Sequence, residues 1–146
     1  MKILSLLILT LFIGTGKGCE SEKKQAIDTA VVEYTANTRG SYQKITVKQQ
    51  TVSVSKDRDG KDKPTVEKIS DADWKELIEA FQTVDLDKLP NLKAPTDKRS
   101  YDGAAIGNLK VILKDKTYET SGFDNGYPPK EIEKLVNKVV SLAKKE

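Results

Sequence analysis

Apolar and polar residues alternate along two stretches of this chain, residues 44–54 and 105–113, and this alternation is the strongest constraint on its fold. Successive side chains of a β-strand point to opposite faces of a sheet, so such a strand buries one face and exposes the other to water. The alternation therefore predicts half-buried antiparallel strands, with a bulge or a tight turn at Gln49–Gln50 and strand pairing on both sides of it. The inward-facing positions of the first stretch are Ile45, Val47, Val52 and Val54.

Two further segments have the composition of strands. Residues 30–37 (AVVEYTAN) are rich in β-branched and aromatic side chains, and Val32 and Tyr34 are expected on one face. Residues 117–123 (TYETSGF) follow residues 105–113 after a short polar turn, so we expect these two segments to form a hairpin.

The charged segment KDRDGKDK, residues 56–63, contains three aspartates and invites comparison with a calcium-binding loop. In an EF-hand the acids stand at the first, third and fifth positions and glycine stands at the sixth. Here Gly60 directly follows Asp59, and the order of acids and glycine does not match. The segment is predicted to be a solvated hairpin tip rather than a metal site.

Two segments have the 3.6-residue period of amphipathic helices. The first begins where Ser70 and Asp73 form a capping box, and its apolar stripe is Trp74, Leu77, Ile78 and Phe81. The second follows Pro128–Pro129, and its stripe is Ile132, Leu135, Val136, Val139 and Leu142. The order of strands, helix, strands, helix predicts an α+β fold: a single antiparallel sheet with two helices packed on one face.

The N-terminus carries Lys2 and then an uninterrupted apolar run from Ile3 to Ile13. A membrane-spanning helix needs about 20 apolar residues, so a run of this length fits the core of a secretory signal peptide. The small residues Gly14, Gly16 and Gly18 suit cleavage by a signal peptidase. We therefore predict export.

Cys19 is the only cysteine in the sequence and stands directly after this segment. Bacterial lipoproteins carry at this place the cysteine that is acylated and becomes the first residue of the mature chain. A single cysteine cannot form an internal disulfide in an exported protein, which favours lipidation over a free or intermolecular thiol. Gly18 fits the lipoprotein pattern, whereas Lys17 puts a charge where a small neutral residue is usual, and ordinary signal cleavage is the rival interpretation.

These features divide the chain into three parts. Residues 1–18 are the predicted signal peptide, residues 19–29 a lipid anchor with a solvated tether, and residues 30–146 a single α+β domain. The expected location is the cell envelope, on its periplasmic or its surface side. The expected attachment is to the lipid bilayer through acylated Cys19.

Composition excludes several classes of function. With no histidine, the chain lacks the usual general base near neutral pH, the commonest metal ligand and any Ser-His-Asp device. The formal net charge of +3 becomes nearly neutral when Lys2 and Lys17 leave with the signal peptide, and the remaining lysines are interspersed with acids. Nucleic-acid binding requires a one-signed basic stripe, so we expect no nucleic-acid partner, and we expect no metal and no cofactor.

Three segments together resemble a known group of proteins. They are EYTANTRGSYQKITV, ISDADWKELIEAFQTVDLDKLPNL and SGFDNGYPPKEIEKLVNKV, in this order behind the lipoprotein-like start. The sequence is similar in these segments to small envelope lipoproteins of Bacteroidetes-type bacteria, and the resemblance covers nearly all of the mature chain. Its motifs are capping, core and turn motifs, so the resemblance implies a fold and a location and specifies no reaction.

Candidate binding residues lie at two turns of the predicted fold. Arg39, beside Gly40, is either an anion contact or an ordinary exposed turn residue. Tyr101 and Asp102, before Gly103, either line a polar pocket or form a turn through the aspartate side chain.

A third candidate is the segment GFDNGYPP, in which Phe123 and Tyr127 flank Asp124, Asn125 and Gly126. Two aromatic rings around a polar tip are typical of binding loops. The alternative interpretation is a strand-to-helix connection in which Phe123 enters the core and Asn125–Gly126 adopt left-handed backbone conformations. We favour this second interpretation.

The leading functional hypothesis is a non-catalytic binding or protein-interaction module at the membrane surface. Its partner would be another envelope protein or a cell-wall component. The second hypothesis is an accessory structural protein of the envelope without a defined ligand. The third is a hydrolase that uses Asp102 and Asp124 as paired carboxylates, because both lie at ends of the second predicted hairpin.

Overall fold

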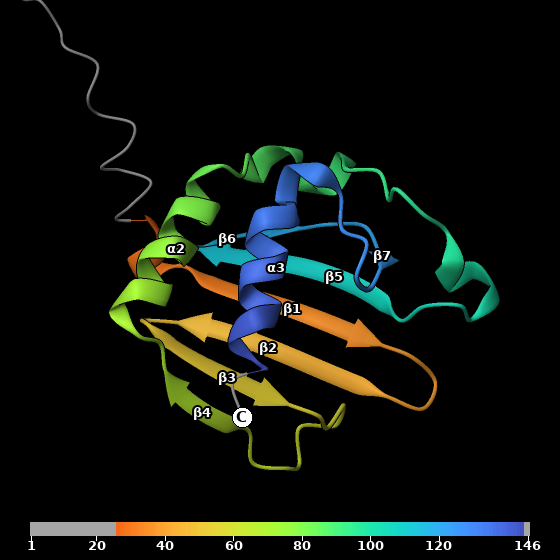
Figure 1. Cartoon of the computed structure of the whole chain (residues 1–146), viewed down its shortest axis with the longest axis horizontal. Coiled ribbons are helices and arrows are strands. Elements are labelled where there is room, and N and C mark those ends of the chain that lie inside the picture. The colour runs from red at the N-terminus through yellow and green to blue at the C-terminus, as the bar shows by residue number, and fades with distance from the viewer. Residues whose placement is uncertain (1–25, 145–146) are drawn as a thin grey trace, which may run out of the picture.

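A computed structural model describes residues 26–144, in which one antiparallel sheet is covered by helices on one of its faces (Figure 1). The strands run in the order β4–β3–β2–β1–β5–β6, and β7 pairs with β5. Their bounds are β1 Val31–Asn37, β2 Tyr42–Lys48, β3 Thr51–Ser55, β4 Thr65–Lys68, β5 Ile106–Leu113, β6 Lys116–Glu119 and β7 Phe123–Asp124. The predicted α+β class is confirmed.

The helices α2 (Asp71–Gln82) and α3 (Glu133–Leu142) lie side by side over the same face of the sheet (Figure 1). The core lies between these helices and the sheet, and the helical residues buried in it are Leu77, Ile78, Ala80, Phe81, Leu135, Val136, Val139 and Leu142. Helix α2 begins as predicted, because the backbone N–H of Asp73 donates to Ser70 Oγ at 3.2 Å. Three short 3-10 helices complete the described chain: η1 Leu86–Asn91, η2 Lys98–Tyr101 and η3 Lys130–Ile132.

Strand β1 joins the two halves of the chain into one sheet. It pairs along its whole length with β2 on one side and with β5 on the other, so that Tyr34 lies opposite both Ile45 and Leu109. All three of these side chains are buried on the helical face. The hairpin from the first half of the sequence and the hairpin from the second half therefore share one core.

The break between β2 and β3 is a tight turn. Gln49 and Gln50 both have positive φ, 49° and 58°, and Lys48 pairs directly with Thr51. Two central residues with positive φ make the kind of two-residue turn whose twist matches that of a hairpin. Of the two predicted alternatives, the tight turn is correct.

The structure differs from the sequence-based expectation in three places. Residues 26–29 are helical and Ile27 is only 1% exposed, so the packed part of the chain starts before the expected end of the tether. Residues 65–68 form strand β4, which had not been predicted: each of its residues is exposed, and pairing with β3 alone defines it. Pro128–Pro129 precede η3, and α3 itself begins only at Glu133.

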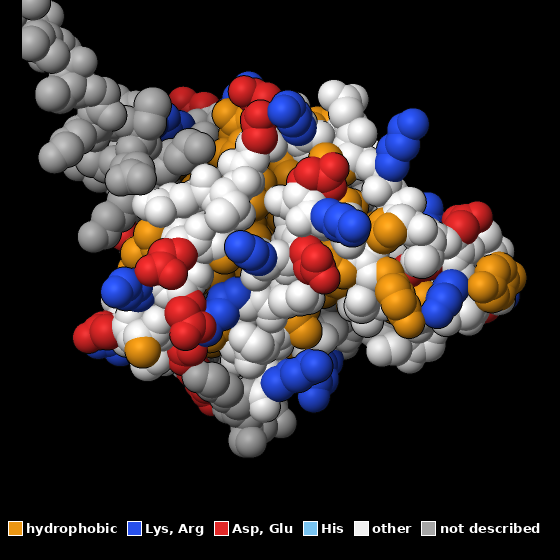
Figure 2. All heavy atoms as spheres, turned by 45° about the horizontal axis from the view of Figure 1, so that its top comes forward, with side chains coloured by type: hydrophobic (Ala, Val, Ile, Leu, Met, Phe, Trp, Pro, Cys, Tyr) orange, Lys and Arg blue, Asp and Glu red, His pale blue; other side chains and the backbone are white. Residues whose placement is uncertain are grey.

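No helix of residues 26–144 lies over the other face of the sheet, which is mainly polar. At its centre Glu33 lies between two lysines of the neighbouring strands, 3.0 Å from Lys44 Nζ and 3.8 Å from Lys110 Nζ. On the helical side, acidic and basic side chains alternate over the surface that Figure 2 shows, without a large area of one sign. Within residues 26–144, no helix has the length and apolar character needed to cross a membrane.

Candidate binding site

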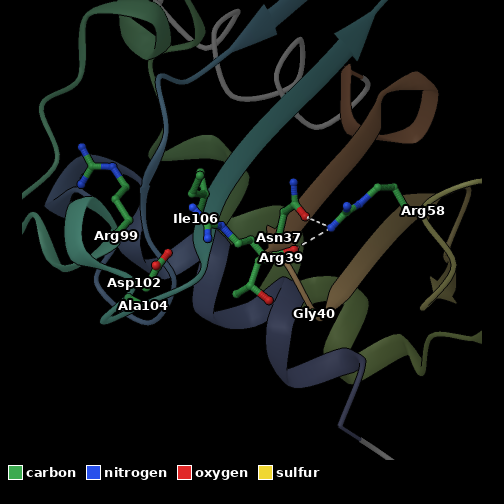
Figure 3. Close-up of a pocket in the computed structure, with 9 residues that line it drawn as sticks. Asn37, Arg39, Gly40, Arg58, Arg99, Asp102, Ala104 and Ile106 are labelled. Atoms are coloured by element: carbon green, nitrogen blue, oxygen red, sulfur yellow. Dashed lines mark hydrogen bonds between the residues drawn. The ribbon is translucent and has the colours of Figure 1, made fainter.

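A pocket of about 690 Å³ opens at the end of the sheet where β1 finishes (Figure 3). Three segments that are distant in sequence form its walls: the β1–β2 turn, the β3–β4 loop and the chain between η2 and β5. The lining residues are Asn37, Thr38, Arg39, Gly40, Arg58, Arg99, Asp102, Ala104 and Ile106. They include all three arginines of the sequence and none of its many lysines. The volume is in the range of small-molecule sites, roughly 300–1,000 Å³.

Arg39 stands at the tip of the β1–β2 turn. The turn is held by the backbone N–H of Thr38, which donates to the carbonyl of Ser41 at 2.8 Å, and by the N–H of Ser41, which donates to Thr38 Oγ1 at 2.9 Å. Arg39 is exposed and has no hydrogen bond or ion pair with any other residue of the range 26–144. A rigid turn therefore presents a guanidinium group that no protein group neutralises.

Arg58 reaches the same pocket from the β3–β4 loop. Its Nη2 donates to Asn37 Oδ1 at 2.5 Å and to the carbonyl oxygen of Thr38 at 2.6 Å, as the dashed lines in Figure 3 show. Its guanidinium carbon also lies 5.9 Å from the centre of the Tyr42 ring. These partners are uncharged, so they fix the position of the guanidinium and leave its positive charge in place.

Asp57 shapes the loop that carries Arg58. Its carboxylate accepts hydrogen bonds from the backbone N–H groups of Asp59, Lys61 and Asp62, at 3.0, 2.5 and 2.9 Å. These bonds lower the pKa of Asp57, and the bond from Asp62 has the largest effect on it. The carboxylate thus organises a hairpin tip, and within residues 26–144 no group of three His, Cys, Asp or Glu side chains is arranged to hold a metal ion.

Arg99 is fixed by the buried carboxylate of Asp124. Asp124 is 0% exposed, and its Oδ1 accepts from the backbone N–H of Arg99 at 2.9 Å and from Arg99 Nη1 at 3.2 Å. Its Oδ2 accepts from Thr96 Oγ1 at 2.5 Å and from the backbone N–H of Lys98 at 2.7 Å. One carboxylate therefore clamps η2 and the chain before it onto β7.

Two opposing effects act on the pKa of Asp124. Burial raises it, because a charged carboxylate loses its hydration. The hydrogen bonds from Thr96, Arg99 and Lys98 outweigh burial and hold the pKa well below its ordinary value. Asp124 is thus a carboxylate with both oxygens occupied, which suits a structural clamp.

Beneath the pocket, Tyr34 connects β1 to the segment after β7. Its hydroxyl donates to Asn125 Oδ1 at 2.6 Å, and its ring centre lies 6.2 Å from that of Phe123. Gly107 makes this contact possible, because a Cβ at that position would lie 2.8 Å from the Tyr34 hydroxyl and 2.9 Å from Phe123 Cε2. Burial raises the pKa of Tyr34 to about 12.

The structure separates the predicted candidate residues into two groups. Arg39 and Asp102 do line one pocket, and Asp102 closes η2 with a left-handed backbone, at a φ of 59°. Phe123 is buried in the core and Asp124 is inaccessible, as in the favoured interpretation of that segment as a connection. One detail of that interpretation is wrong: Gly126 has a positive φ of 91°, and Asn125 does not.

The aromatic residues named as candidates lie outside the pocket lining. Tyr101 is 72% exposed. Tyr127 is 46% exposed, and the Nζ of Lys98 lies 4.3 Å from its ring centre and 3.2 Å from its hydroxyl. Tyr127 and Asn125 thus hold local structure around the clamp, and the structure brings neither into the pocket.

Sequence reasoning missed Arg58, Arg99, Asn37 and Ile106 as pocket residues. No motif spacing relates positions 39, 58 and 99, because tertiary structure alone brings them together. One signal was available: arginine is rare in this sequence and lysine is abundant, so each arginine stands out as a position where lysine was not used.

The lining has two ends of different character. Arg58 stands at one end beside Asn37 and the Asp102 carboxylate at the other beside Ala104, and the guanidinium of Arg39 lies between these ends, turned toward Ile106 (Figure 3). Ile106, which is 47% exposed, adds an apolar surface to the pocket. This arrangement can bind and orient a polar ligand.

Comparison with known proteins adds no family: no protein-family model matches the sequence, and no curated protein is similar to it. The functional argument therefore depends on the geometry of the pocket.

Proposed function

We propose that the protein is a non-catalytic binding module of the cell envelope, anchored to the membrane by a lipid on Cys19, and that the arginine-lined pocket is its binding site. The observation that carries this proposal is the convergence of all three arginines of the sequence on one pocket. Arg58 and Arg99 also hold protein groups around the pocket, whereas Arg39 has no hydrogen-bond or ion-pair partner within residues 26–144.

The position of the pocket supports the proposal. The described chain begins at Ala26, at the end of the sheet where β1 starts, and the pocket lies at the end where β1 finishes. The seven residues of β1 separate these two ends by roughly 20 Å. A module tethered through its N-terminus would therefore present this pocket away from the membrane surface.

The chemistry of the candidate carboxylates supports binding over hydrolysis. A pair of catalytic carboxylates needs both groups in contact with the substrate. Asp124 is fully buried and its two oxygens accept four hydrogen bonds, so it has no route to a substrate. The hydrolase hypothesis therefore loses one of its two carboxylates.

Anchoring is tested by fractionation of cells that produce the protein with Cys19→Ser. If Cys19 carries the lipid, the wild-type protein is found in the membrane fraction and the variant in the soluble fraction. A variant that remains with the membrane would contradict lipid attachment through this residue.

Binding is tested by capture from envelope extract with the detergent-solubilised protein, followed by mass spectrometry of proteins and glycans. We expect a captured component that is lost with Arg39→Ala. The matched control is Lys75→Ala on the exposed side of α2, which removes the same charge outside the pocket. Identical captured sets for the wild type and both variants would refute the pocket as the binding site.

A further inference from the structure

We propose that the pocket recognises a small polar ligand through an oxyanion, a carboxylate or a phosphate group, for which Arg39 and Arg58 provide the positive charge. This inference deepens the proposed binding function and rests on it. The relevant ligand class is an acidic saccharide or a molecule of similar size and polarity, with its anionic group near Arg39 and Arg58 and hydroxyl groups toward Asp102.

The pocket contains positive charge that the protein does not balance. Arg99 is balanced by Asp124 at 3.2 Å and by Asp97 at 3.4 Å. Arg58 has only neutral partners, and Arg39 has no partner within the described part of the chain. Two guanidinium groups thus lack a countercharge from residues 26–144, and an anionic ligand would provide it.

The cationic side chains of the pocket are arginines and not lysines. A guanidinium group presents several N–H donors in a fixed plane and binds carboxylate or phosphate with two parallel hydrogen bonds, whereas a lysine ammonium acts as a point charge. Lysine serves almost everywhere else on this surface, and every arginine is in this pocket. Arg58 and Arg99 use these donors to hold protein groups as well, whereas the donors of Arg39 have no partner within residues 26–144 and are available to an oxyanion.

Hydrogen bonds within the protein preorganise Arg58 and the turn that carries Arg39. The hydrogen bonds from Arg58 to Asn37 and Thr38 hold its guanidinium in place before any ligand arrives, and the bonds between Thr38 and Ser41 fix the turn below Arg39. A group that is already ordered loses little conformational entropy on binding. The guanidinium of Arg58 and the backbone that carries Arg39 are therefore ordered before a ligand binds.

The remaining lining residues suit the part of the ligand that carries no charge. Asp102 provides an acceptor for hydroxyl donors, and Ile106 together with Ala104 provides a small apolar surface against which a sugar ring can lie. A pocket of about 690 Å³ is large enough for one or two sugar rings.

The experiment is an NMR titration of the detergent-solubilised protein that follows the Nε–Hε signals of its three arginines. The probes are glucuronate, which carries a carboxylate, glucose 6-phosphate, which carries a phosphate, and neutral glucose. We expect saturable shifts of the Arg39 and Arg58 signals with at least one acidic probe, a smaller shift of the Arg99 signal, and none with glucose. A response to one acidic probe alone identifies the anionic group.

Conservative variants distinguish directional recognition from general attraction. Arg39→Lys and Arg58→Lys keep the charge and remove the planar fork, and each is expected to weaken binding of the acidic probe at least about tenfold. Lys75→Ala should change the affinity by less than about twofold, because an exposed charge outside the pocket is screened by salt. Equal affinity of the wild type and both arginine variants overturns the inference.

Failure of the inference is distinguishable from failure of the proposed function. If no acidic probe produces a saturable shift while capture from envelope extract still depends on Arg39, the ligand class is wrong and the binding function stands. If neither probe binding nor capture depends on Arg39, both are wrong. Equal responses to glucose and glucuronate likewise overturn oxyanion recognition.

Discussion

Replacing Tyr34 with phenylalanine removes a single hydroxyl group from the layer beneath the pocket. Tyr34 is 1% exposed, and that hydroxyl donates to Asn125 Oδ1 at 2.6 Å. A typical hydrogen bond of this kind contributes about 1 kcal/mol to stability, and Asn125 is exposed, so water can replace the lost donor. At pH 8 we therefore expect Tyr34→Phe to lower the free energy of unfolding by about 1 kcal/mol.

At higher pH the order of stability of the wild type and Tyr34→Phe should reverse. The pKa of Tyr34 rises from 10.0 to about 12 on burial, so between these values the unfolded chain loses the phenolic proton and the folded protein keeps it. A raised pKa contributes stability that is complete below pH 10 and is lost as the pH rises toward 12. The pKa values of the unfolded and folded states differ by about two, and each pKa unit corresponds to about 1.36 kcal/mol, so the full loss of stability is about 3 kcal/mol. At pH 11 the loss is about half of that.

The wild type should therefore lose its advantage over Tyr34→Phe near pH 11. Urea unfolding between pH 8 and pH 11.5, followed by circular dichroism, measures both free energies under identical conditions. Tyr101→Phe is the matched control, because it removes a tyrosine that is 72% exposed and should follow the wild type throughout. A difference between the wild type and Tyr34→Phe that stays constant over this range would refute the account of the buried hydroxyl.

Three further changes test the structure, two of them near the pocket and one at the start of α2. Gly107→Ala places a Cβ 2.8 Å from the Tyr34 hydroxyl and should cost about 1–3 kcal/mol in urea unfolding, whereas Gly40→Ala, with nothing within 4 Å, should cost less than about 0.5 kcal/mol. Asp124→Asn removes a carboxylate whose lowered pKa stabilises the fold above the ordinary pKa and ceases to do so as the pH falls. The variant should therefore lose less stability on acidification than the wild type. It should also show faster hydrogen exchange at the backbone N–H groups of Lys98 and Arg99, which donate to this carboxylate. Ser70→Ala removes the acceptor at the start of α2 and should cost about 1 kcal/mol, and a cost near zero would show that the cap is redundant.

Most of the sheet follows from local sequence. Strands β2, β3 and β5 were predictable because their alternation specifies which face is buried, and α2 was predictable from its apolar stripe and its cap. Strand β4 was not predictable, because all four of its residues are exposed. Even Val66 is 58% exposed, so β4 has no buried side chains whose spacing would indicate a strand. Its strand conformation comes from backbone hydrogen bonds to β3, which leave no pattern in the side chains.

The candidate site was predictable only in part, for a related reason. Arg39 and Asp102 stand out because each lies at a turn beside glycine. The burial of Asp124 depends on donors 25 to 28 residues earlier in the chain, and no local pattern announces a contact of that separation. The segment around Asp124 allowed both a binding loop and the favoured strand-to-helix connection, because the same polar residues suit an exposed tip and a buried clamp.

The charge balance of the pocket sharpens the expected ligand preference. With Arg99 balanced by the buried Asp124, the lining retains the positive charges of Arg39 and Arg58 against the single lining carboxylate of Asp102. The carboxylate of Asp97, which also lies 3.4 Å from Arg99, is exposed to solvent and outside the lining. This excess of one positive charge matches a singly charged carboxylate, whereas a phosphate ester carries nearly two negative charges at pH 7 and would leave the site negative. We therefore expect glucuronate to bind more tightly than glucose 6-phosphate, and Asp102→Asn to narrow or reverse that order because it removes the carboxylate that opposes the second phosphate charge. The titration that follows the arginine signals measures both affinities in both proteins, and an order that does not respond to Asp102→Asn would show that Asp102 does not sense the charge of the ligand.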